Sequence, residues 1–234
     1  MTRGQEARRR YSDALSETQE ARVPEVAHGG AGAVARCPPG LASGGVTKDE
    51  DLAVLRRALD QLAALLADVR PEASGDPTPC TEWTVQDLID HVVAAPTRFA
   101  RMLREEPIDW SAATPPAGDD PAGALRSSAD DLLGAWRDHS GPVGDAGLDW
   151  QCAELAVHTW DLATAVHAST DGLDPRVAER GLAFMRSSLT PANRGPVFGS
   201  QQPAPDGADA YGRIAAFAGR SVQPRDGAVR SPGA

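Results

Sequence analysis

One stretch of this chain, residues 149–163 (DWQCAELAVHTWDLA), has almost no polar side when it is read as a helix. Strong helix formers dominate it, and no Gly or Pro occurs in residues 150–168. A helix that is apolar all round is covered by other parts of a protein instead of lying on its surface. We therefore expect this helix, and the polar side chains that it carries, to lie inside the fold.

Glu154 and His158 are four residues apart in this stretch, so on a helix they project from the same face. A carboxylate and an imidazole in this arrangement can bind one divalent cation together, as the two histidines of HExxH metalloenzymes do. An isolated pair with this spacing is more often a surface ion pair, but the apolar neighbours disfavour a surface position here. Because a buried carboxylate is costly unless it is paired or bound to a metal, the pair needs a partner from elsewhere in the chain.

His91 is the residue that can provide this partner. Thr84 and Asp87 form a cap-like pair at the start of a predicted helix, and His91 lies on the apolar face of that helix. A histidine on an apolar face is often only a hydrogen-bonded core residue. Together with Glu154 and His158, however, it completes a set of three metal ligands.

Asp161 falls on the same stripe as His158, one turn further along. It is either a charge on the protein surface or an acceptor for the free N–H group of a ligand histidine. Four other residues have suitable side chains but are excluded by their position along the chain: Cys80, Cys152, His139 and His167. With no fourth protein ligand, the metal is expected to be accessible, in a pocket with Trp83 and Trp160 as its walls.

The segment 47–220 reads as helical throughout, with no alternating run of β-branched residues that would indicate a strand. We expect four main helices and two shorter pieces. Their predicted positions are a helix from the Thr47 capping box to before Pro71, one from Thr84 with a kink at Pro96, one over about 121–139, one over 150–168, one from Asp174, and a closing piece from Tyr211 that ends at Gly219. The first has a leucine seam that is either a coiled-coil dimer interface or, as we favour for so short a seam, part of a bundle interior.

Residues 1–46 are rich in Gly and Pro and carry few large apolar side chains. Such a segment cannot bury enough apolar surface to offset the entropy lost on ordering, so we expect a disordered extension that is dispensable for folding. Residues 221–234 are expected to form a flexible tail for the same reason. The folded domain is therefore predicted to span residues 47–220.

The composition narrows the classes of function. The formal net charge of the 234-residue chain is -10, which disfavours a nucleic-acid partner because phosphate binding relies on a basic surface. No run of eighteen apolar residues predicts a membrane span, and the N-terminus lacks the apolar core of a secretory signal, so a cytoplasmic location is expected. The three scattered cysteines predict neither a disulfide framework nor a cysteine zinc site.

Two motifs resemble those of a known family. Residues 77–85 (PTPCTEWTV) followed by 88–91 (LIDH), and residues 154–163 (ELAVHTWDLA), are similar to the N-terminal, metal-binding domain of mycothiol-dependent maleylpyruvate isomerase. They look closer still to the actinobacterial single-domain proteins related to it. The resemblance covers about residues 47–220 and implies a DinB-like four-helix bundle with a divalent metal on His91, Glu154 and His158. The isomerase has a further C-terminal domain, whereas only a tail follows Arg220 here, so the metal site is implied more firmly than the isomerase reaction.

The resemblance and the ligand set lead to two functional hypotheses. In the first, the protein is a metal-dependent enzyme that uses a low-molecular-weight thiol such as mycothiol on an electrophilic substrate, in a transfer or isomerisation. In the second, it binds or senses metal without turnover. Zn²⁺ is the expected ion, but two imidazoles and a carboxylate also suit Ni²⁺ or Fe²⁺. A purely structural bundle with hydrogen-bonded His and Glu is the third interpretation, and a monomer or a homodimer is expected in each case.

Overall fold

The structure is a computed structural model that describes residues 47–80, 83–109, 112–140, 144–191, 194 and 198–224. Within these residues the chain forms six α-helices and one 3₁₀ helix, and no strand. The expected disordered extension, residues 1–46, and residues 225–234 of the expected tail lie outside the described part, so both expectations stay predictions.

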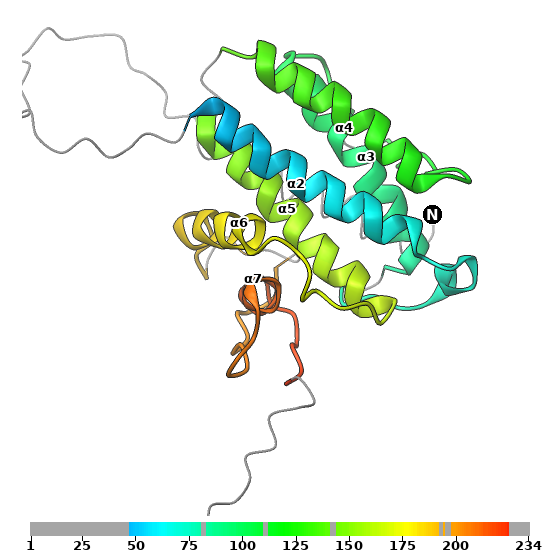
Figure 1. The fold of residues 1–234 in the computed structure, drawn as a ribbon, viewed down its shortest axis with the longest axis vertical. Coiled ribbons are helices and arrows are strands. Elements are labelled where there is room, and N and C mark those ends of the chain that lie inside the picture. The colour runs from blue at the N-terminus through cyan, green and yellow to red at the C-terminus, as the bar shows by residue number, and fades with distance from the viewer. Residues whose placement is uncertain are drawn as a thin grey trace, which may run out of the picture.

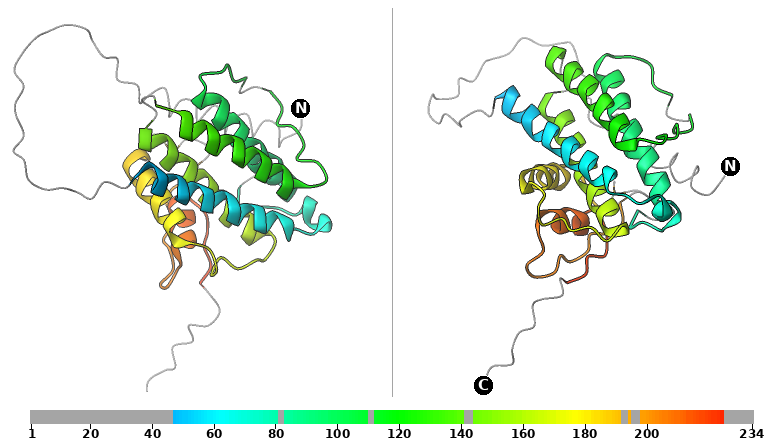
Figure 2. Two further views of the ribbon diagram at one scale, coloured as in Figure 1. Left: turned by 45° about the horizontal axis from the view of Figure 1, so that its top comes forward. Right: turned by 45° about the vertical axis from the view of Figure 1, so that its right-hand side comes forward.

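The fold is an all-α, DinB-like bundle, as the sequence predicted (Figure 1). Its elements are α2 (Lys48–Ala67), η1 (Pro71–Gly75), α3 (Val85–Leu103), α4 (Pro121–Asp138), α5 (Gly144–Ala165), α6 (Pro175–Ser188) and α7 (Ala210–Phe217). Helix α4 packs against α2 and α3, and α5 packs against α2 and α3. Helices α6 and α7 cover α5 on the side away from α3 and α4, as the two views of Figure 2 show.

Most helix starts agree with the sequence because they depend on local caps. The Thr47–Glu50 and Thr84–Asp87 pairs both form reciprocal capping boxes, in which each side chain accepts from the backbone of the other residue. Helix α3 continues through Pro96 without a break, and the kink predicted there stays a prediction. A single missing N–H group removes one helical hydrogen bond, and the packing of α3 against α4 maintains the rest.

Both ends of α5 differ from the predicted range of 150–168. The helix begins earlier, at Gly144, because the buried Leu148 packs into the core and outweighs the poor helix propensity of the glycines. It ends earlier, at Ala165, because His167 adopts a left-handed φ of 56°. The amide of Ala168 then donates to the carbonyl of Ala163 at 2.8 Å, which is the hydrogen bond of a Schellman cap formed without glycine.

The leucine seam of α2 faces the interior of this one chain. Leu55 and Leu62 are fully buried, and α2 lies against α4 and α5. The seam is therefore bundle core and not a coiled-coil dimer interface. Among the described helices, none is long and apolar enough to cross a membrane.

Helix α5 occupies the centre of the fold. Every residue over 151–163 is buried, and the helix contacts α2, α3, α6 and α7. The expectation that this segment has no solvent-facing side is confirmed. Its polar residues Glu154, His158 and Asp161 therefore need partners inside the protein.

Candidate metal centre

The three predicted ligands meet between α3 and α5. His91 projects from α3, whereas Glu154 and His158 project from the same face of α5. The Nε2 atom of His91 lies 2.7 Å from Oε1 of Glu154, and the Nε2 atom of His158 lies 3.4 Å from the same oxygen. One ligand atom from each residue falls within 4.8 Å of the others. All three residues are buried, with exposed fractions of 5, 6 and 0%.

Trp83 covers this cluster from the chain segment before α3. Its ring stacks on the His158 imidazole, with centroids 5.7 Å apart and an interplanar angle of 19°, and lies 4.8 Å from the His91 ring. The amide of Val85 donates to the carbonyl of Asp76, which folds this segment back against the start of α3. Trp83 therefore lies against the cluster, and the accessible pocket expected there stays a prediction.

Trp160 does not share this position. It follows His158 by two positions on α5, so it projects roughly 200° round the helix, towards the opposite side. Among the described residues no ring contact joins it to either histidine of the cluster. Helical periodicity therefore disfavours Trp160 as the second wall of the predicted pocket.

Asp161 is fully buried, so the alternative of a surface charge does not apply. Its Oδ2 atom accepts a hydrogen bond from Nδ1 of His158 at 3.1 Å. This is the contact expected of a residue that orients a ligand histidine. A second partner, Arg220, donates from Nε and Nη2 to the two carboxylate oxygens at 3.1 and 2.9 Å. No spacing argument connected Arg220 with Asp161, because Arg220 follows it by 59 positions in the sequence.

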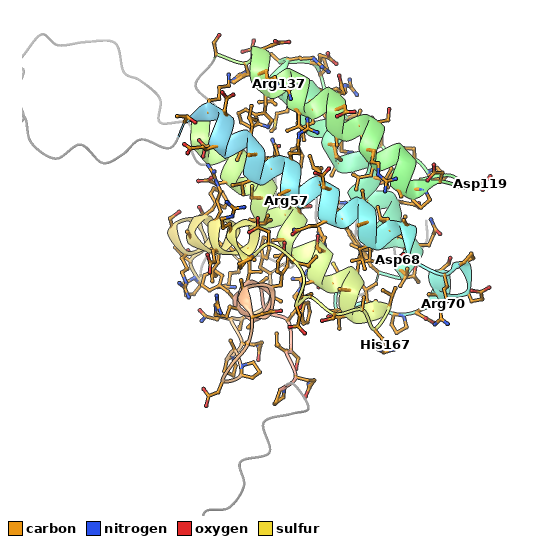
Figure 3. All side chains as sticks on the ribbon, in the orientation of Figure 1. Arg57, Asp68, Arg70, Asp119, Arg137 and His167 are labelled. Atoms are coloured by element: carbon orange, nitrogen blue, oxygen red, sulfur yellow. The ribbon has the colours of Figure 1, made fainter. Side chains whose placement is uncertain are left out.

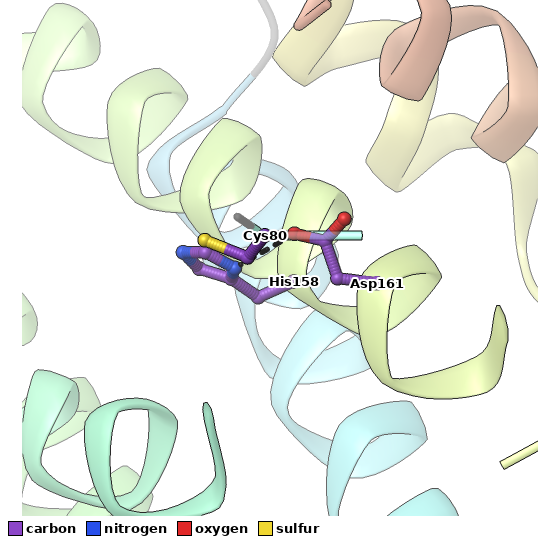
Figure 4. Close-up of side chains that lie close together, drawn as sticks. All are labelled: Cys80, His158 and Asp161. Atoms are coloured by element: carbon purple, nitrogen blue, oxygen red, sulfur yellow. Dashed lines mark hydrogen bonds and ion pairs between the residues drawn. The ribbon is translucent and has the colours of Figure 1, made fainter. Parts of the chain in front are cut away.

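Cys80 also lies beside this cluster, although the sequence excluded it. Its sulfur is within 4.8 Å of ligand atoms of His158 and Asp161, and Figure 4 shows the three side chains together. The exclusion counted helical turns along the chain, but residues 76–80, 83 and 84 are not helical. Thr78 and Trp83 are joined by a backbone hydrogen bond of 3.1 Å, and this turn brings Cys80 back to α5. A second, overlapping set of three side chains that could hold a metal ion therefore shares His158 with the first.

Comparison with known proteins agrees with this geometry. The family model of the mycothiol maleylpyruvate isomerase N-terminal domain matches residues 55–163. Two uncharacterized proteins of Mycobacterium tuberculosis, from two strains, are each 36% identical to this chain over 184 residues, which is 72% of this chain and 96% of each relative. The chain belongs to this isomerase N-terminal domain family. No solved structure matches it significantly.

Membership of the mycothiol maleylpyruvate isomerase N-terminal domain family indicates a metal-binding, DinB-like domain, and the structure supplies candidate ligand groups for an ion. The matched region contains all three predicted ligands, as well as Cys80 and Asp161. It ends well before Arg220, so the contact between Arg220 and the cluster lies outside what the family model describes.

The charges of the cluster are strongly coupled. Burial alone would lower the pKa of His158, but Glu154 and Asp161 outweigh it and raise this pKa to about 9. Burial would raise the pKa of Glu154, but His158 and His91 hold it well below the ordinary value. The pKa of His91 is lowered, because burial outweighs its hydrogen bond with Glu154. Near pH 7 the metal-free cluster therefore holds a protonated His158, an ionised Glu154 and a neutral His91.

The remaining candidates lie away from the cluster. His139 is the C-cap residue of α4, and its Nδ1 atom is 3.1 Å from the carbonyl oxygen of Leu103. His167 is exposed beyond the end of α5, at the edge of the molecule in Figure 3. Cys152 is buried as a free thiol, and burial raises its pKa to about 12. The structure brings neither of these histidines to the site.

Proposed function

We propose that this protein binds one divalent metal ion through His91, Glu154 and His158. The observation that carries the proposal is the convergence of these three side chains, from two helices, on one buried point. Two imidazole nitrogens and a carboxylate form a ligand set typical of zinc sites that keep positions open for other ligands. Zn²⁺ is the ion we propose, and Ni²⁺ or Fe²⁺ suits the same ligands.

Other residues of the chain prepare these ligands. The hydrogen bond from Nδ1 of His158 to Asp161 selects the tautomer in which Nε2 is available, and Nε2 is the nitrogen that faces Glu154. Trp83 restricts the rotation of both imidazole rings by lying against them. A divalent ion bound here would lower the pKa of a coordinated water or thiol.

We propose further that the protein is an enzyme that uses a low-molecular-weight thiol, of the mycothiol kind, on a small electrophilic substrate, in a transfer or isomerisation. The family to which the chain belongs supports a thiol partner. The alternative is a protein that binds or senses metal without turnover. In either case we propose a cytoplasmic monomer or homodimer that has no nucleic-acid partner.

Elemental analysis of protein purified without a histidine tag tests metal binding. We expect close to one zinc ion per chain after reconstitution, and a loss of this ion in His91→Asn. The matched control is the double variant His139→Asn/His167→Asn, which removes two imidazoles outside the site and should retain the ion. Metal-free protein after reconstitution would leave only the interpretation of a structural bundle.

A second measurement separates the two functional hypotheses. Protein loaded with Co²⁺ should have a visible spectrum that changes when mycothiol or another small thiol is added. A spectrum that millimolar thiol does not alter would favour metal binding without catalysis.

A further inference from the structure

Among the described residues, the most deeply buried cation outside the three-ligand cluster is Arg220, just after α7, which is only 6% exposed. Its guanidinium group makes a two-point contact with the carboxylate of Asp161, which is itself fully buried. A buried ion pair of this kind is maintained only if the geometry is good, because both charges lose their hydration. A buried ion pair therefore lies directly beside His158.

The backbone holds Arg220 in this position through the C-terminal cap of α7. Gly219 has a φ of +93°, its amide donates to the carbonyl of Ala216, and the amide of Arg220 donates to the carbonyl of Ala215 at 3.0 Å. These are the two hydrogen bonds of a Schellman cap. A Cβ atom at Gly219 would lie 2.7 Å from the Cα of Gly199, so the close approach of two backbone segments also requires glycine there.

A continuous set of hydrogen bonds connects this cap to the predicted ligand. The Oδ2 atom of Asp161 accepts both from Nη2 of Arg220 and from Nδ1 of His158. These two hydrogen bonds therefore hold the Asp161 carboxylate between Arg220 and His158. The carboxylate in turn holds the His158 imidazole in its orientation. Without Arg220, the Asp161 carboxylate would lose the two hydrogen bonds that it accepts from the segment after α7, and its orientation would be less restricted.

We propose that Arg220 is a positioning residue of the metal centre, which acts through Asp161 to hold Nε2 of His158 towards the ion. This inference rests on the proposed metal site. It follows that metal binding and the docking of the segment around Arg220 stabilise each other, since coupling between two equilibria is reciprocal. The C-terminal part of the chain is then a component of the site and not only a covering of α5.

Zinc affinity of the full chain, measured by competition with a chromophoric chelator, tests this proposal. Arg220→Met removes the charge and the donors but keeps most of the side-chain length, and it should weaken zinc binding about tenfold, as loss of an outer partner of a metal ligand does. Arg220→Lys keeps the charge without the two-point contact and should fall between this variant and the natural protein. The control Arg213→Met removes an arginine of α7 that pairs with Glu179, and it should leave the affinity within about twofold.

A double-mutant cycle with Asp161→Asn tests whether Arg220 acts on His158 through Asp161. If Arg220 acts through Asp161, adding Arg220→Met to Asp161→Asn should cost little further affinity. Fully additive losses would overturn the route. An Arg220→Met protein that melts at a lower temperature but binds zinc as tightly as the natural chain would show a merely structural residue and overturn the proposal. Failure of the natural chain itself to bind zinc would instead refute the proposed function.

Hydrogen exchange of the natural chain keeps the proposal testable if Arg220→Met does not fold. Zinc should slow exchange of the amides of the α7 cap, Ala218, Gly219 and Arg220, by a larger factor than the amides of α4. Equal factors in the two regions would contradict the coupling.

Discussion

Two clusters of charge, one partly buried and one fully buried, lie along α5 and differ in what they can bind. Near the start of the helix, Arg180 of α6 donates to Asp149 of α5 and to Asp51 of α2. Further along, Glu154 and His158 meet His91 of α3. The side chains of the first cluster keep exposed fractions of 13–28%, whereas those of the second are 0–6% exposed.

The difference lies in the cationic partner. A guanidinium group has only donors and keeps its charge at every accessible pH, so Arg180 is not a metal ligand, and its contacts connect α2, α5 and α6. An imidazole can exchange its proton for a metal ion. Buried charge alone therefore does not identify a functional site. The comparison indicates that the type of nitrogen beside the carboxylate decides what the cluster can bind.

The largest expected effect comes from His158→Asn in the second cluster. It removes a ligand that also connects Glu154 with Asp161, so zinc affinity should fall by more than the roughly hundredfold loss that outer partners produce. Competition with a chelator measures this. A loss below about tenfold would mean that the ion, if any, is held elsewhere.

Arg180→Met, in the first cluster, should lower the stability of the fold and leave zinc affinity almost unchanged. It leaves the carboxylates of Asp51 and Asp149 without their shared partner, so we expect a loss of about 2 kcal/mol in the free energy of unfolding, less than for a fully buried pair. Zinc affinity should stay within about twofold. Chemical denaturation of the metal-free protein and chelator competition measure the two quantities, and a large loss of zinc affinity would break the distinction between the clusters.

The third effect is the pH dependence of zinc binding. Because the pKa of His158 in the metal-free protein is raised to about 9, a proton occupies this ligand at neutral pH and zinc must displace it. Apparent affinity should therefore rise about tenfold for each pH unit between 6.5 and 8.5 and level off near 9. In Asp161→Asn, which removes one of the two carboxylates that raise this pKa, the levelling should begin at a lower pH. A flat profile for the natural chain would contradict the charge state assigned to His158.

The smallest effect is expected for Cys80→Ser, which separates the two overlapping sets of side chains. Burial and the nearby Asp161 raise the pKa of the Cys80 thiol to about 12, so it is protonated and a poor ligand near neutral pH. Zinc affinity should change by less than about threefold, whereas His91→Asn should lose most of it. The reverse ranking would assign the ion to Cys80, His158 and Asp161.

The sequence predicted those features that depend on neighbouring residues. Capping boxes determine the starts of α2 and α3, since each cap needs only residues three apart. The shared face of Glu154 and His158 follows from helical periodicity alone. The lack of a polar side on α5 correctly indicated that both are buried. Placing His91 beside them needed the further step of treating a histidine on an apolar face as a partner for a buried carboxylate.

The tertiary structure alone decided which residues surround the cluster. Cys80 reaches it through a turn that counting along the chain did not reveal. Arg220 reaches it because the chain returns over α5 and because two glycine backbones approach closely at Gly199 and Gly219. Spacing in a sequence determines which side chains share one helix face, because backbone hydrogen bonds set that geometry locally. Contacts between distant segments depend on how whole elements pack, and packing is a property of all the buried surfaces together.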